Sequence, residues 1–181
     1  MVHVSILLAA TVLALTLTLT ASESAFANDG QVVTVRGTVT VNGKALRRTT
    51  RIKSGDTIET GPRSSVRLMM ADSSVIDLRA HTQFAVENFT YEKKQPSKAR
   101  SFFNLLRGTF RIVSGAISKL GPGRLRVTAG TATIGIRGSF QEISFGGVGV
   151  QVLSAAGTAT ISVPGHPPVS VGSGSVGNLD I

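Results

Sequence analysis

The residues that could carry out acid–base, metal or nucleophilic chemistry are few in this chain of 181 residues. It contains no cysteine, which excludes a thiol nucleophile, cysteine-ligated zinc and a disulfide framework. The histidines are His3, His81 and His166, and neither of the last two has a second ligand at a spacing typical of a metal site. We therefore expect exposed histidines, no bound metal and no cofactor.

The acidic residues number 10, and their spacing singles out no carboxylate pair for hydrolysis. Residues 172–177 match the glycine pattern of dinucleotide-binding loops. Only four residues follow them, too few for the helix that would receive the pyrophosphate. We expect a non-enzymatic protein. A hydrolase is the remaining enzyme class, and it would require a cleft with a titratable pair.

The positive charge is confined to one part of the chain. Nineteen Lys and Arg against 10 Asp and Glu give a formal net charge of +9, and every base lies between Arg36 and Arg137. Such a surface suits an anionic partner, namely an acidic polysaccharide, lipid headgroups or an acidic protein. The alternative is a solvated basic face that keeps a β-rich protein soluble and its sheet edges charged. The candidate anion-facing or partner-facing bases are Lys44, Arg47, Arg48, Arg51, Lys53, Lys93, Lys94, Lys98, Arg100, Arg124 and Arg126.

Nucleic acid is not an expected partner of this basic surface. The chain has no Trp and a single Tyr, so platforms for base stacking are scarce. It also carries no recognised nucleic-acid-binding motif.

The first 27 residues have the pattern of a secretory signal peptide. An apolar run covers residues 6–20, and Ala25-Phe26-Ala27 supplies a cleavage pattern of small residues. We expect cleavage near Ala27 and a secreted or periplasmic mature chain. The alternative is an uncleaved membrane anchor, because the run reaches the lower limit of the length that spans a bilayer.

Beyond that segment the chain has the pattern of short strands. Apolar and polar residues alternate over 33–41, 65–70, 124–129 and 158–163, as expected for strands with one buried face. The only helical candidate, residues 97–107, is short and uncapped, so strand or irregular structure is favoured there.

Turn residues separate these segments. Asn42-Gly43 is a strong signal for a tight hairpin. Gly-Thr pairs at Gly37, Gly108, Gly130 and Gly157 each open a strand-like segment, where a glycine suits a corner or a bulge. The sequence predicts an all-β fold, either a β-sandwich or a flattened β-solenoid of short strands. We expect this domain over residues 28–171 and a loose Gly/Ser-rich tail over 172–181.

Several motifs follow one another in a characteristic order between residues 32 and 163. They are Arg36-Gly37-Thr38-Val39-Thr40-Val41, Gly55-Asp56-Thr57-Ile58-Glu59-Thr60-Gly61, Arg107-Gly108-Thr109-Phe110, and Ile134-Gly135-Ile136-Arg137-Gly138-Ser139-Phe140. In this order the chain resembles the FecR domain family. One departure is that the family's Asp-Gly-Ser turn is Asp72-Ser73-Ser74, and Ser and Asp can also form tight turns. The family-motif residues that we expect to be structural are Gly37, Gly55, Asp56, Gly61, Gly108, Arg137 and Gly138.

The resemblance implies a function in the bacterial envelope. Founding members of the family look like sigma-factor regulators that span the inner membrane and have a periplasmic FecR domain. Because only a few residues precede the apolar run, we do not expect the anti-sigma role here. The exported module is then expected to be a binding, sensor or adaptor module in cell-surface signalling, with another envelope protein adding a strand to an exposed sheet edge. The alternative is a surface protein that binds an anionic envelope polymer through its basic face, a contact that salt would weaken more.

Overall fold

A computed structural model describes residues 30–180 of the chain. The expected signal peptide and its cleavage position lie outside the described residues. Within residues 30–180 no helix has the length and apolarity needed to cross a membrane. The elements are β1 (Gly30–Arg36), β2 (Val39–Val41), β3 (Lys44–Ala45), β4 (Arg51–Ile52), β5 (Thr57–Thr60), β6 (Ser65–Met70), β7 (Val75–Leu78), β8 (Gln83–Thr90), η1 (Pro96–Lys98), β9 (Arg100–Val113), η2 (Ile117–Lys119), β10 (Leu125–Ala129), β11 (Ala132–Gly146), β12 (Gly149–Ser162), β13 (Val169–Val171) and β14 (Ser175–Leu179).

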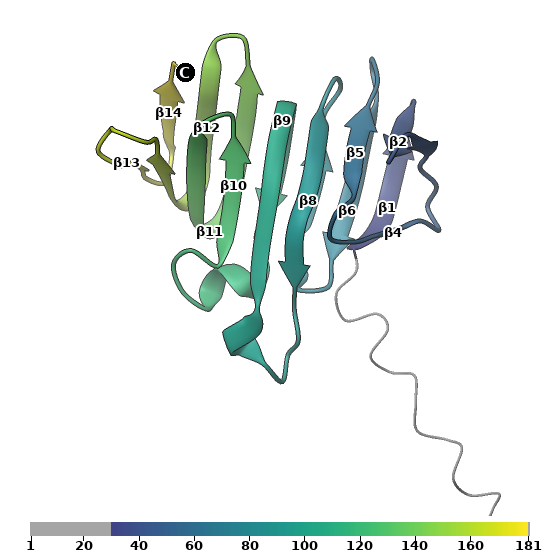
Figure 1. Cartoon of the computed structure of the whole chain (residues 1–181), viewed down its shortest axis with the longest axis horizontal. Coiled ribbons are helices and arrows are strands. Elements are labelled where there is room, and N and C mark those ends of the chain that lie inside the picture. Colours follow the sequence, from purple (N-terminus) through teal and green to yellow (C-terminus); the bar gives the residue numbers. More distant parts are fainter. Residues whose placement is uncertain (1–29, 181) are drawn as a thin grey trace, which may run out of the picture.

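Hydrogen bonds join these strands into one 14-stranded sheet that folds over into two layers (Figure 1). The fold-over follows from the long strands, because the two halves of β9 pair with different neighbours. Its first half pairs with β8 and β10, and its second half pairs with β7 and β11. We call layer A the strands β3, β2, β5, β8, β10 and β13 with the first halves of β9 and β11 and the second half of β12. Layer B consists of β4, β1, β6, β7 and β14 with the other halves.

Glycines allow the chain to cross between the layers. In β9, β11 and β12 the crossing points have φ of 93° at Gly108, 128° at Gly138 and 99° at Gly157, a region that other residues rarely adopt. Gly37 serves the same purpose between β1 and β2 with φ of 69°. Three of the four Gly-Thr pairs therefore mark corners. Gly130 differs, because it lies in the hairpin turn between β10 and β11.

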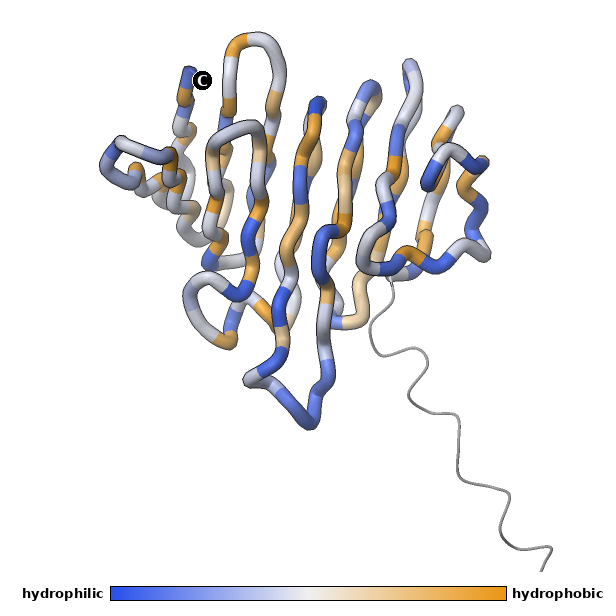
Figure 2. The backbone as a smooth tube through the Cα atoms, in the orientation of Figure 1, coloured by the Kyte–Doolittle hydropathy of each residue, from blue (hydrophilic) through white to orange (hydrophobic). Residues whose placement is uncertain are grey.

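The core lies between the layers and consists of the apolar residues that alternate along each strand (Figure 2). Phe84 is at its centre, with its ring centroid 5.1 Å from that of Phe103 in the same layer and 5.1 Å from that of Phe110 in the opposite layer. All three are fully buried. Burial of each such side chain contributes about 1.5–3 kcal/mol, so an apolar core rather than disulfides holds the fold.

The all-β prediction is confirmed, as is the hairpin at Asn42-Gly43, where both residues have positive φ between β2 and β3. The expectation of a loose tail is wrong, because residues 175–179 form β14 and pair with β12. The physical reason is Gly177, where a Cβ would lie 2.5 Å from a methyl group of Val171. The missing side chain lets β14 close over the end of the core, so this glycine supports a strand instead of loosening it.

Candidate functional site

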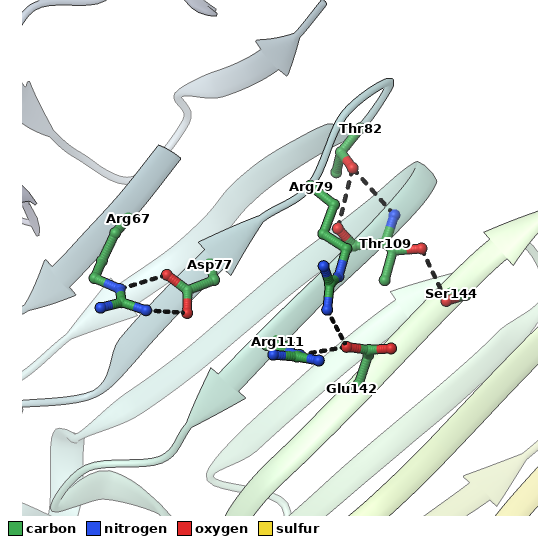
Figure 3. Close-up of polar contacts among 8 residues, drawn as sticks. All are labelled: Arg67, Asp77, Arg79, Thr82, Thr109, Arg111, Glu142 and Ser144. Carbon is green, nitrogen blue, oxygen red and sulfur yellow. Dashed lines mark hydrogen bonds and ion pairs between the residues drawn. The ribbon is translucent and has the colours of Figure 1, made fainter. Parts of the chain in front are cut away.

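A row of alternating charges crosses the outer face of layer B (Figure 3). Its members lie on the adjacent strands β6, β7, β9 and β11, and strand register places each opposite the next: Arg67, Asp77, Arg111 and Glu142. We call this row the charge ladder. Arg67 donates from Nε and Nη2 to the two oxygens of Asp77 at 2.6 and 2.8 Å, and these contacts raise the pKa of Arg67. Opposite charges at facing positions stabilise strand pairing.

Glu142 binds two arginines at one carboxylate oxygen. Arg111 donates to it from Nε, and Arg79 donates from Nη2 at 3.1 Å. Burial raises the pKa of Glu142, but the hydrogen bonds and charges of the two arginines outweigh burial and hold the pKa below its ordinary value. The carboxylate is therefore ionised at neutral pH, and it joins β9 to β11 rather than acting as a proton donor.

Hydroxyl groups continue this face toward the corner at Gly108 (Figure 3). Thr82 donates from Oγ1 to the carbonyl of Thr109 at 3.0 Å and accepts from the N–H of Thr109 at 3.1 Å. The hydroxyls of Thr109 and Ser144 lie 2.9 Å apart. A Cβ on Gly108 would come within 2.5 Å of Thr82 Cα, so this cluster holds the corner closed.

A shallow depression of about 290 Å³ lies over the same face, with Arg36, Arg67, Asp77, Arg79 and Arg111 among its lining. Its carboxylate, that of Asp77, is already bonded to Arg67. Within the described part of the chain, no group of three or more His, Asp or Glu could hold a metal ion. The depression presents mainly guanidinium donors, which suit contact with an anion.

Two other acids bond to turns of the fold. Asp56 accepts from Asn42 Nδ2 at 2.7 Å and from the N–H of Lys53 at 2.8 Å. Asp72 is buried and accepts from the N–H and Oγ of Ser74, at 3.0 and 2.5 Å, and from the N–H of Ile117 at 3.3 Å. The carboxylate oxygens of both residues accept hydrogen bonds that stabilise turns. The family-motif residue Arg137 is exposed at the corner of β11.

The predicted bases lie on different segments of the fold. One group lies at the N-terminal edge of the sheet and a second in loop 91–99 and the start of β9. Arg124 joins the second group, because it donates to the carbonyls of Ser97 at 2.5 Å and Ala99 at 3.2 Å. Arg126 on β10 adjoins this group, with its guanidinium carbon 4.0 Å from the ring centroid of Phe102 at the start of β9. The predicted bases thus come from three segments, namely the N-terminal edge, loop 91–99 with the start of β9, and β10.

The N-terminal edge of the sheet is short and charged. Its outermost strands, β3 and β4, have two residues each. The bases on these strands and their connections are Lys44, Arg47, Arg48, Arg51 and Lys53. Very short edge strands and charged side chains are the usual protection against pairing with another chain.

The C-terminal edge has no such protection. Strand β13 and the five-residue β14 each pair with β12 on one side only. No Lys, Arg, Asp or Glu occurs in residues 143–179. Val169 and Val176 are 49% and 54% exposed on these strands. We call β13 and β14 the open edge, because it offers uncharged strand backbone to an incoming chain.

An apolar hollow of about 190 Å³ adjoins the open edge. It is lined by residues from both layers, namely Ile161, Val163, His166, Pro167, Val169, Asn178 and Leu179. A strand added to β14 would carry alternate side chains toward the core side. The hollow is therefore placed to receive an apolar side chain of an added strand.

Sequence reasoning assigned no role to Glu142 or to the open edge. Glu142 stands far along the chain from Arg79 and Arg111, and only strand register brings the three together. The absence of charge over residues 143–179 was visible in the sequence. This absence did not identify a sheet edge, because the Gly/Ser-rich composition of the last residues predicted a loose tail instead of strand β14.

A family model described as FecR protein matches residues 56–176 of the chain. No curated protein sequence matches it significantly. Among solved structures, two crystal structures described as a "putative anti-sigma factor from Parabacteroides distasonis ATCC 8503", at 1.65 and 2.50 Å resolution, superpose with TM-scores of 0.51 and 0.52. Both are 12% identical to this chain, cover 68% of it and have 59% of their own length covered. At this identity the likeness concerns the fold, and the chain spans about three fifths of the length of those proteins.

Proposed function

The chain belongs to the FecR protein family, and from that premise we propose that it is a non-enzymatic binding module of the bacterial envelope that acts in cell-surface signalling. Its proposed partner is another envelope protein, which supplies an extended segment to the open edge. In this mode, backbone hydrogen bonds provide affinity and side-chain pockets provide specificity.

The observation that carries this proposal is the difference between the two edges of the sheet. The N-terminal edge has two-residue strands among five bases, whereas β14 has five uncharged residues and an apolar hollow beside it. An uncharged edge strand left unpaired in a protein is a template for strand addition. The open edge is thus the part of the molecule best suited to a partner.

Photocrosslinking in the native envelope tests this proposal. A photoreactive residue in place of Val176 on β14 is expected to capture a protein partner, whereas the same residue in place of Arg48 at the N-terminal edge is not. The captured adduct should persist when the salt concentration is raised before irradiation, because strand addition relies on backbone hydrogen bonds rather than on exposed charges. Capture from position 48 alone, or capture lost with salt, would contradict the proposal.

We also propose export of the chain by the segment 1–27, which supports a periplasmic or secreted location. The support is the apolar run followed by Ala25-Phe26-Ala27. Sequencing the N-terminus of the protein recovered from the envelope fraction is expected to give Asn28 as the first residue. Recovery of Met1 from the membrane fraction would identify an uncleaved anchor instead.

A further inference from the structure

The outer face of layer A over β10, β11 and β12 carries guanidinium and hydroxyl groups and no carboxylate. A hollow of about 520 Å³ lies there, and the polar side chains that line it are Arg126, Arg137, Thr133, Thr158, Thr160 and Ser162. We call this hollow the threonine groove. It is remote from the charge ladder, which occupies the outer face of the other layer.

Gly135 forms the floor of the threonine groove. Strand register places it between Arg126 on β10 and Thr160 on β12. A Cβ on Gly135 would meet its nearest atom at 3.9 Å, and its φ does not require glycine. The fold would thus accept a side chain at this position, and the missing side chain creates the depth of the groove.

The polar groups of the groove are available to a ligand. None of the ion pairs in the described part of the chain involves Arg126 or Arg137. The hydroxyls of Thr158 and Thr160 make no hydrogen bond within residues 30–180, whereas Thr128, outside the groove, donates to the carbonyl of Phe103 at 3.2 Å. The ring of Phe102 supports the guanidinium of Arg126 at 4.0 Å, a cation–π contact that restricts its position.

We propose that the threonine groove binds an acidic saccharide, with a sugar carboxylate against Arg126 and Arg137 and ring hydroxyls against the threonines. A guanidinium presents paired N–H groups that match a carboxylate. A threonine hydroxyl both donates and accepts, as a sugar hydroxyl does. An anion without hydroxyls would use the arginines and leave the threonines unpaired, and the open shape of the groove suits a polymer chain. This site is independent of the open edge and of the partner proposed there.

Calorimetric titration of the purified protein with polygalacturonate tests the proposal, with dextran as the neutral polymer and dextran sulfate as the sulfated one. Arg126→Gln and Thr160→Val remove one ligand contact each, and Gly135→Ile fills the floor. Gly146→Ile is the matched control for the last change, because Gly146 also lies on β11 with no atom within 4 Å of a Cβ there. Arg48→Gln is the control for charge.

Binding of polygalacturonate but not of dextran is the expected result. Loss of a charge-assisted hydrogen bond should weaken binding at least about tenfold in Arg126→Gln, and Gly135→Ile should weaken it by a similar factor. Both controls should stay within about twofold. If Arg48→Gln weakened binding as much as Arg126→Gln, the attraction would be non-specific electrostatics, and the proposed site would be refuted. Dextran sulfate bound as tightly as polygalacturonate, or binding unaffected by Gly135→Ile, would also overturn it.

Discussion

Ser73 has a strained backbone conformation that lowers the stability of the fold. It lies in the exposed turn between β6 and β7 with φ of 66°, the left-handed region in which a side chain is strained. Relief of this strain in Ser73→Gly is expected to raise the free energy of unfolding by about 1 kcal/mol. Chemical denaturation measures the change. Ser73→Ala removes the same hydroxyl but keeps the Cβ, so it should give no gain, and an equal gain in both variants would refute the strain.

Glu142 makes stability depend on pH. Its folded-state pKa lies below its ordinary value, mainly because the hydrogen bonds of two arginines outweigh burial. The ionised carboxylate thus contributes stability that is fully present above the unfolded-state pKa of about 4.3. That contribution is lost as the pH falls through the folded-state pKa.

Glu142→Gln is accordingly expected to lower the free energy of unfolding at pH 7 by about 1 kcal/mol and to flatten its decline in acid. Urea denaturation at a series of pH values checks both effects. Glu87→Gln, an exposed carboxylate on the outer face of layer A, is the matched control and should keep the wild-type pH profile. An unchanged profile in Glu142→Gln would mean that the arginine contacts are not maintained in solution.

At the scale of elements, the corners between layers depend on close backbone contact. A Cβ on Gly157 would lie 2.5 Å from Gly138 Cα and 2.6 Å from the carbonyl oxygen of Arg137. Neither atom can move without displacing β11. Gly55 has a similar φ of 91° but no atom within 4 Å of its Cβ position. A substitution at Gly55 therefore measures the cost of backbone strain without the cost of close contact.

Gly55→Ala should therefore cost about 1 kcal/mol, and Gly157→Ala should cost roughly 2–3 kcal/mol more, because overpacking adds to the strain. Thermal or chemical denaturation of the two variants gives the comparison. Equal losses of unfolding free energy in the two variants would contradict this prediction. They would show that glycine is needed at the corner only for its positive φ and not for close contact.

The strands and turns could be predicted from sequence because their signals are local. Alternation of apolar residues located the strands, and Asn42-Gly43 located a hairpin. Which strand faces which across the core could not be predicted, because β9 changes neighbours at Gly108 and register over distant segments decides the pairs. The charge ladder and the threonine groove follow from that register and are invisible along the chain. Strand β14 was missed because Gly177, which permits its packing, has the appearance of a linker residue.

At the scale of the whole molecule, the sheet is polarised from one edge to the other. All 19 Lys and Arg precede Gly138, while the last strands hold none. The basic end resists pairing with other chains, and the uncharged end permits it. The molecule also offers two proposed modes of recognition: backbone pairing at the open edge and carboxylate recognition in the threonine groove. Salt should distinguish them, because it screens the second far more than the first.

Hydrogen exchange of the complex with the crosslinked partner measures whether the open edge receives a strand. The amides of β14 that are not bonded to β12 exchange freely in an unpaired edge and should slow markedly once a strand is added. We expect new protection at residues 175–179 and none at residues 51–52 of β4. Unchanged exchange in β14 with the partner bound, or protection at β4 instead, would contradict this expectation.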